Sequence, residues 1–374
     1  MNERAGCYQS QPTGYKAFIP KNQPPKPAIE IGEDVRKLLV STEQKLAELN
    51  GIGFSLPNPD LFIMMAIRKE ALLSSQIEGT QATMTDVLTY ETWEEVDNLD
   101  DVQEVVNYIK ALHHGITRID QLPLCIRVIK ECHEILLNSV RGHEKTPGEF
   151  RKSQNWIGQS LKNAIFIPPP ESEVPELVGN LEKFINQEDH IPILIKCALI
   201  HYQFETIHPF LDGNGRIGRL LIDLFIHWKE LLDKPLIYTS LFFKENRQEY
   251  FDRLMMVRKN GNFEQWVEFF LTGMHWSAKH AIEKIKQILL LQDNLRQKIV
   301  KEKKASVRSI QLLDILFVSP LTTINDIAEK LDISFQAASE QIRFFLALGI
   351  LEEITGQKRS RRFAFAPYLR IVEE

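Results

Sequence analysis

The chain has 374 residues, of which 44% are hydrophobic and 25% charged, a composition typical of a globular protein with two or three domains. Its formal net charge of −5 excludes a surface that coats nucleic acid or an anionic membrane throughout, so any basic partner site must be local. Four cysteines without a C-x-x-C pair are too few for a disulfide scaffold. We find neither a secretory leader nor a membrane-length apolar stretch, and we expect a cytoplasmic protein with no membrane partner.

The first half of the chain is predicted to be almost entirely helical. Prolines among polar residues in 1–28 favour an extended surface arm, and a helix over 29–49 should end at Gly51 and Gly53. A helix-start signal at Asn58-Pro59-Asp60 opens the next helix, which should end at a glycine, Gly79. Further helical periodicity covers 84–92, 100–117, 122–140, 193–207 and 217–232.

Two segments depart from this helical pattern. Short apolar pieces at 156–158 and 164–167 flank a polar stretch and precede a proline run, which predicts a β-hairpin. A strand-like piece also covers 236–241. Helical periodicity then continues to about residue 275, and a charged amphipathic helix is expected over 277–304.

The chemically richest segment is HPFLDGNGRIGR, which runs from His208 to Arg219 between two apolar helices. The sequence Gly213-Asn214-Gly215 permits a turn whose N–H groups point inward, and the following helix adds its positive dipole end. Two arginines beside that helix end are unfavourable unless an anion neutralises them. The segment therefore predicts a cradle for a polyphosphate.

Two further side chains give this cradle its chemistry. Asp212 offers hard oxygen ligands suited to Mg²⁺. His208 has a reference pKa of about 6.5 and can take up a proton at neutral pH. Together they indicate proton abstraction beside a metal-bound polyphosphate.

The same letters also satisfy the dinucleotide-binding pattern G-x-G-x-x-G, through Gly213, Gly215 and Gly218. That fingerprint needs a preceding β-strand and an acidic residue about 20 positions later. Here the apolar helix over 193–207 precedes it, and the strand-like piece at 236–241 contains no acid. We therefore reject a dinucleotide fold, and no P-loop pattern occurs.

The segment matches every fixed position of H-P-F-x-[DE]-G-N-[GK]-R-x-x-R, so the chain resembles Fic proteins over about residues 55–275. The resemblance implies a helical Fic fold that transfers AMP from ATP to a Ser, Thr or Tyr hydroxyl of a target protein, or of the chain itself. In this resemblance His208 is the catalytic base and Asp212 holds Mg²⁺. The implied ATP-binding residues are Glu78, His208, Gly213, Asn214, Gly215, Arg216, Ile217, Gly218, Arg219, Asn246 and Tyr250.

Two more segments are similar to parts of that family. Ser74-x-x-x-Glu78-Gly79 resembles its inhibitory motif, and the i, i+4 spacing puts the serine and the carboxylate on one helical face. A carboxylate there can pair bidentately with Arg219, and Arg219 would then be unable to bind the γ-phosphate of ATP. The predicted hairpin resembles the family's flap, whose strand-like pairing would align the target. The implied docking residues are Gly158, Ala164, Ile165, Phe166 and Ile167.

Residues 307–370 resemble a winged helix-turn-helix module. From Ala305 onward there are 8 basic and 9 acidic residues, so the module is not basic, and a protein partner or a second copy of the chain in a homodimer suits it as well as DNA. The residues that would face DNA are Gln336, Ser339, Arg343, Lys358, Arg359, Arg361 and Arg362.

We therefore predict a mainly α protein: a Fic helical core with a small β-hairpin flap, followed by a winged helix-turn-helix domain. The expected parts are an N-terminal arm and helix (1–54), an inhibitory-helix region (55–100), the Fic catalytic core (101–276), a connecting helix (277–304) and the winged-helix domain (305–374). The alternative is a DNA-binding transcriptional regulator whose core senses nucleotide or removes AMP. The sequence does not name the target protein.

Overall fold

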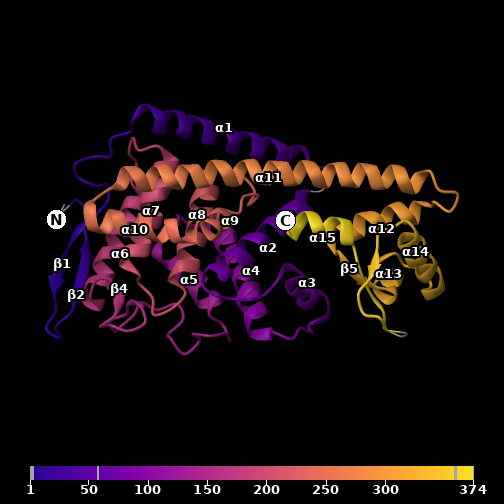
Figure 1. The fold of residues 1–374 in the computed structure, drawn as a ribbon, viewed down its shortest axis with the longest axis horizontal. Coiled ribbons are helices and arrows are strands. Elements are labelled where there is room, and N and C mark those ends of the chain that lie inside the picture. Colours follow the sequence, from indigo (N-terminus) through magenta and orange to yellow (C-terminus); the bar gives the residue numbers. More distant parts are fainter. Residues whose placement is uncertain (1–3, 57–58, 358–359, 374) are drawn as a thin grey trace.

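The computed structural model describes residues 4–56, 59–357 and 360–373. It is predominantly helical, as predicted, with three small antiparallel sheets among these residues (Figure 1). The helices of the first two-thirds are α1 (Glu33–Ser55), α2 (Pro59–Ile77), α3 (Met84–Trp93), α4 (Leu99–Ile119), α5 (Ile126–Leu136), α6 (Val174–Asn186), α7 (Ile193–Ile207), α8 (Asn214–Trp228), α9 (Ser240–Glu245) and α10 (Arg247–Asn260). The described helices include none that is both long and apolar enough to cross a membrane.

The core is built around α7, whose bounds equal the predicted 193–207. Every residue of this helix after the first is buried, because apolar side chains cover all of its faces. Helix α8 packs against α7 and is itself buried along most of its length. The His208–Arg219 segment, which comprises the loop between them and the first turns of α8, is therefore held between two buried helices.

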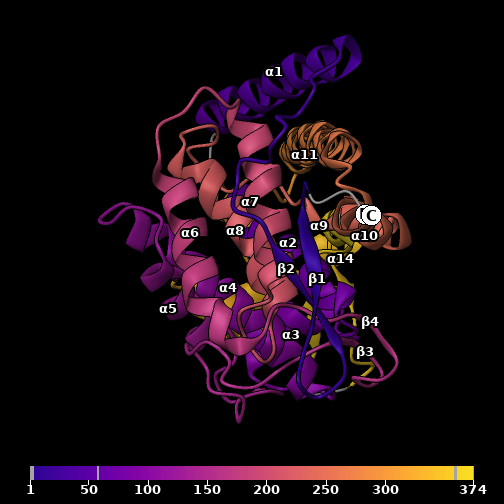
Figure 2. The ribbon, with the colours of Figure 1, turned by 90° about the vertical axis from the view of Figure 1, so that its left-hand side faces the viewer.

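The N-terminal arm is a two-stranded hairpin, β1 (Gly6–Ser10) and β2 (Lys16–Pro20), where the sequence indicated only an extended arm. Figure 2 shows it beside a second hairpin, β3 (Ile157–Gly158) and β4 (Ala164–Phe166), which is the predicted flap. The Phe18 amide donates to the Ile167 carbonyl over 2.9 Å, and the Phe18 ring is buried. The arm thus braces the flap.

Two helices are longer than predicted, and one predicted strand is absent. Helix α1 continues through Gly51 and Gly53, where a side chain on Gly53 would come within 2.7 Å of Leu236, so the glycine permits close packing rather than ending the helix. Helix α11 (Phe263–Val300) is continuous, and the expected connecting helix 277–304 is its second half. The segment 236–241 forms no strand: it is coil that leads into α9.

The C-terminal part consists of a helix, a short strand, two helices, a hairpin and a last helix. Its elements are α12 (Val307–Val318), β5 (Leu321–Thr323), α13 (Ile324–Lys330), α14 (Phe335–Ala347), β6 (Glu352–Glu353), β7 (Arg362–Ala364) and α15 (Ala366–Glu373). The strands pair in the order β5–β7–β6. Helix α15 was not predicted, and the assignment of this part as a winged helix stays a prediction.

This C-terminal part docks on α2 and α3. The buried Lys69 ammonium of α2 donates to the Val372 carbonyl over 2.6 Å and so caps the end of α15. Arg362 pairs with Glu95 and lies 4.3 Å from the centre of the Trp93 ring. The α15 end of the module is thus attached to the helix that carries Ser74 near its own C-terminus.

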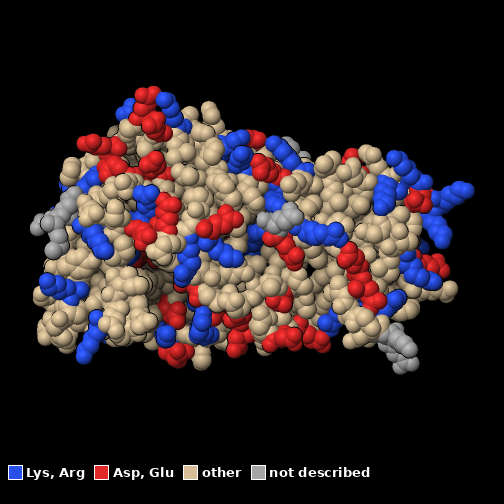
Figure 3. Space-filling model, viewed as in Figure 1, with Lys and Arg blue, Asp and Glu red and all other residues tan. Residues whose placement is uncertain are grey.

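The residues predicted to face DNA have different surroundings. Gln336 and Arg343 are exposed on α14 and Ser339 is half-buried, whereas Arg361 pairs with Glu353 and Arg362 faces α3. Lys358 and Arg359 lie outside the described residues. Figure 3 shows the C-terminal part in the view of Figure 1. Charges of both signs are interspersed on the visible face, and Lys and Arg gather where α11 is followed by α12.

Candidate active site

The loop between α7 and α8 has a fixed backbone. His208 ends α7 in the left-handed region (φ 51°), and Gly213 (φ 72°) lets the chain enter α8 at Asn214. The Asn214 side chain accepts from the Phe210 amide (2.8 Å) and donates to the Phe210 carbonyl (2.9 Å). Asn214 therefore braces the loop through its side chain, and its own backbone N–H lies at the start of α8.

His133 of α5 supports the same loop, and the sequence analysis missed it. Its Nε2 lies 3.0 Å from the Asp212 carbonyl, its Nδ1 accepts from the Gly148 amide, and its ring stacks on Phe210 with centres 3.7 Å apart. Burial lowers the pKa of His133 to about 4, which keeps the ring neutral and able both to donate and to accept. Only the fold brings this helix to the loop.

His208 is largely buried, with 17% of its side chain exposed. Burial, together with the charges of Arg258 and Arg151, lowers the pKa of His208 to about 4. Its Nδ1 makes no hydrogen bond to any described residue. The imidazole is therefore neutral near pH 7 and able to accept a proton.

Asp212 is the carboxylate of the loop. Its Oδ1 accepts from the Gly213 amide over 2.6 Å, its Oδ2 lies 3.1 Å from the Lys145 ammonium, and Arg216 approaches to 3.7 Å. Burial raises its pKa, but the Lys145 hydrogen bond and the Arg216 charge outweigh burial, so the pKa is lowered. Asp212 thus stays ionised, and it is the one loop residue suited to hold a divalent cation.

The first arginine of α8 pairs with a residue that the sequence analysis did not identify. Arg216 donates to Glu104 of α4 over 3.0 Å, and each side chain is 2% exposed. Glu104 also accepts from Thr80 (3.1 Å) and pairs with the more exposed Arg141 (3.3 Å). In the sequence, Glu104 is a glutamate among mostly apolar helix residues. It gave only a weak indication of a functional role, because nothing in the sequence indicated its partner.

The second arginine contacts the predicted inhibitory motif. Arg219 donates to Ser74 Oγ (2.8 Å), to the Ser74 carbonyl (2.9 Å) and to Glu78 Oε1 (2.7 Å). Glu78 lies in the turn just after α2, before Gly79 (φ 105°). The carboxylate contacts the guanidinium through one N–H, where we had expected a bidentate pair.

Glu78 also lies directly over the glycine turn. A side chain on Gly215 would meet Glu78 Oε1 at 2.2 Å, so the carboxylate covers the backbone that was predicted to cradle phosphate. Burial raises the pKa of Glu78, but the charge and hydrogen bond of Arg219, together with the charges of Arg216 and His208, outweigh burial, so the pKa is lowered. The carboxylate is ionised, and 36% of its side chain is exposed.

Asn246 and Tyr250, two of the implied ATP-binding residues, would bind the adenine base, and both lie at the start of α10. Asn246 is half-buried and its side chain donates to the Phe242 carbonyl over 2.9 Å. Tyr250 is 1% exposed, and its hydroxyl lies 2.8 Å from His201 Nε2 within a cluster of aromatic rings. Tyr250 thus has a packing role here, and the part of both residues in base binding stays a prediction.

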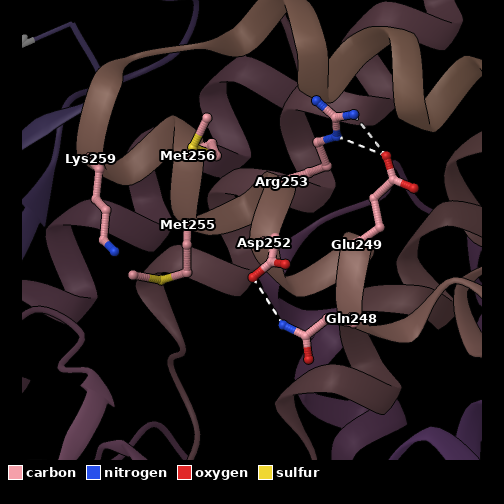
Figure 4. Close-up of a pocket in the computed structure, with 7 residues that line it drawn as sticks. All are labelled: Gln248, Glu249, Asp252, Arg253, Met255, Met256 and Lys259. Carbon is pink, nitrogen blue, oxygen red and sulfur yellow. Dashed lines mark hydrogen bonds and ion pairs between the residues drawn. The ribbon is translucent and has the colours of Figure 1, made fainter.

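Side chains of α10 line a surface pocket (Figure 4), and the lining does not include Tyr250: Gln248, Glu249, Asp252, Arg253, Met255, Met256 and Lys259. Gln248 donates to Asp252 and Arg253 to Glu249 along this lining, so its polar side chains satisfy one another. It includes no residue of the loop. This surface pocket is therefore separate from the site.

The flap residues differ in exposure. Ile165 is 69% exposed and Ala164 half-buried, whereas Phe166 and Ile167 are buried. Gly158 is exposed and pairs with Ala164 across the hairpin. The tip of the flap thus offers exposed backbone, and its base belongs to the core. Ile217 of the loop helix is likewise buried in the core.

The fold and this loop together define a class: helical proteins that present a base, a carboxylate, a glycine turn and two arginines at the start of one buried helix. Two family models match the chain. The N-terminal region of the Fic/DOC family covers residues 36–117, and the Fic/DOC family domain covers 123–226. The chain belongs to the Fic/DOC family.

Curated relatives carry the name protein adenylyltransferase Fic. The protein from Drosophila willistoni is 26% identical over 247 residues, which are 63% of this chain and 47% of the relative. The one from Drosophila erecta is 29% identical over 200 residues, which are 52% of this chain and 37% of the relative. The chain thus spans less than half the length of either relative.

Solved structures share the fold. A Fic family protein from Desulfovibrio desulfuricans G20 aligns over 88% of this chain and 95% of its own, with a TM-score of 0.57 and 19% identity. A fragment of Fic-1 from C. elegans aligns over 67% of this chain and 72% of its own, with a TM-score of 0.54 and 20% identity. The helical Fic fold predicted from the sequence is confirmed.

Proposed function

We propose that this protein transfers AMP from ATP to a hydroxyl side chain of a target protein and releases pyrophosphate. The observation that carries the proposal is a neutral histidine, an ionised aspartate and two arginines around one glycine turn at the start of a buried helix. The name of the curated relatives supports the same activity. The target protein is defined only by an exposed Ser, Thr or Tyr, and residues of the chain itself qualify.

The chemistry follows from the loop. His208 accepts the proton of the attacking hydroxyl, whose oxygen bonds to the α-phosphorus while the bond to the pyrophosphate oxygen breaks. N–H groups of the Gly213–Gly215 turn and the positive end of α8 hold phosphate oxygens. Arg216 and Arg219 neutralise the β- and γ-phosphates, whose charge grows as pyrophosphate departs.

Mg²⁺ fits the donor set of this loop. The described residues contain no group of three or more His, Cys, Asp or Glu that could hold a metal ion, but Mg²⁺ bound to a nucleotide usually takes only one or two protein carboxylates. Asp212 is ionised, partly exposed and adjacent to the glycine turn, so it would hold the ion. The ion would neutralise phosphate charge, and Lys145 would have to release Asp212.

The proposal includes autoinhibition by Glu78. Its carboxylate occupies both the Arg219 guanidinium and the surface of Gly215, so ATP phosphates and Glu78 compete for the same groups. Removal of Glu78 frees them. The exposed flap edge at Gly158 to Ile165 would then pair with an extended target segment.

The test is incorporation of label from α-labelled ATP and Mg²⁺ into protein, with the Glu78→Gly variant as enzyme and a cell lysate as target. We expect label on the target or on the chain itself, and none with Glu78→Gly/His208→Ala. Labelling that survives loss of His208 would contradict its role as base. No label with either variant would overturn AMP transfer and favour a transcriptional regulator.

A further inference from the structure

One buried carboxyl group beside His208 has no assigned role. Glu205 lies on the last turn of α7, three residues before His208, and only 6% of it is exposed. Its Oε1 makes no hydrogen bond to any described residue. Buried carboxylates are almost always paired, so this orphaned oxygen needs an explanation.

The neighbouring helices hold Glu205 in this position. A side chain on Gly218 of α8 would meet Glu205 Oε1 at 2.2 Å, so the glycine leaves the space that the carboxyl group fills. Arg258 of α10 donates to the Glu205 carbonyl (3.1 Å) and to Thr206 Oγ1 (3.2 Å), which fixes the last turn of α7. Gly218, the third glycine of the G-x-G-x-x-G pattern, thus leaves room for the Glu205 carboxyl group.

The carboxyl group faces the base. Glu205 Oε2 lies 4.0 Å from His208 Nδ1, the nitrogen that makes no hydrogen bond to the described residues. The other charged groups that act on the pair are Arg219 of α8, Arg258 of α10, Arg151 and Glu78. Burial raises the pKa of Glu205 to about 7; Arg219 and Arg258 lower it, while Glu78 raises it.

We infer that Glu205 is a positioning residue for His208: its carboxylate faces Nδ1, orients the ring and stabilises the imidazolium formed when Nε2 takes the proton of the attacking hydroxyl. This inference rests on the proposed function. A buried negative charge beside the second ring nitrogen favours the protonated ring, as in other base–carboxylate pairs. The charges of Arg258 and Arg151 disfavour that state, so a carboxylate beside the ring would oppose them.

The test compares Glu205→Gln and Glu205→Asp, each combined with Glu78→Gly, by kcat and KM for ATP from about pH 5 to about pH 8.5. In the Glu78→Gly parent, kcat should rise with pH as Glu205 loses its proton, and the rise should lie below pH ~7 because the Glu78 charge is gone. Glu205→Gln should remove this rise and lower kcat roughly 10–100-fold at neutral pH, with little change in KM. Glu205→Asp should keep the rise.

Three outcomes would decide the matter. A Gln variant that loses kcat equally at every pH, with the parent's profile, would show a structural role only and overturn the inference. If the Gln variant does not fold, as judged by thermal unfolding, an Asp variant that has lost the rise overturns the inference. An inactive Glu78→Gly parent would refute the proposed function instead, so the two failures are distinguishable.

Discussion

Two arginines, one turn apart on α8, are paired with glutamates from opposite sides of the loop. On the α4 side, Glu104 and Arg216 are each 2% exposed and form part of the core. On the α2 side, Arg219 is 1% exposed but Glu78 is 36% exposed and comes from a turn rather than a helix.

The difference in exposure between Glu104 and Glu78 indicates that the Glu104–Arg216 pair is structural and that the Glu78–Arg219 pair is replaceable. A buried charge that loses its partner is strongly destabilised, so the Glu104 pair must persist whatever else binds. Glu78 can leave into solvent, and Arg219 keeps two hydrogen bonds to Ser74 when it does. We therefore expect an incoming phosphate to replace the carboxylate on the α2 side.

The largest expected effect comes from breaking the Glu104–Arg216 ion pair on the α4 side. Glu104→Ala leaves Arg216 buried without its carboxylate and should lower the free energy of unfolding by about 3–5 kcal/mol. Denaturant unfolding measures this loss. The matched control, Glu78→Ala, should cost about 1 kcal/mol or less, because its carboxylate is partly exposed. Equal losses in the two variants would erase the distinction between the pairs.

The next effect is on activity. Glu78→Gly removes the carboxylate that competes with ATP phosphate for Arg219 and should raise the rate of label transfer from ATP roughly 10–100-fold. Initial rates at low ATP concentration measure it, because competition for Arg219 is strongest there. Glu78→Asp retains the charge on a shorter side chain and should give an intermediate rate. An unchanged rate in Glu78→Gly would refute autoinhibition.

The smallest effect concerns Ser74. Ser74→Ala removes the Oγ acceptor of Arg219 but keeps the Ser74 carbonyl and Glu78, so it costs about 1 kcal/mol, and transfer should change less than about 5-fold. The same assay measures it, and Ser75→Ala, whose side chain makes no hydrogen bond to the described residues, is the control. A gain as large as that of Glu78→Gly would move the inhibitory contact from the carboxylate to the serine.

The sequence predicted an element well where the residues that determine its structure are close together in the chain. The bounds of α7 and the flap hairpin follow from local periodicity and turn residues. Local rules failed at Gly51 and Gly53, where α1 continues, and at Gly53 close packing against Leu236 outweighs the low helix propensity of glycine. They also could not place Tyr250, because only the aromatic cluster around it decides that its ring is buried.

By itself, the sequence determined which loop is the candidate active site, because twelve consecutive residues carry the proposed base, the aspartate, the glycine turn and both arginines. The family resemblance added Glu78, which lies 141 positions from Arg219. Only the tertiary structure decided which groups support that loop: Glu104 lies 112 positions from Arg216, and His133 lies 79 from Asp212. Such pairs leave no periodic signal, since their energy comes from burial and contact between helices that meet only in the folded chain.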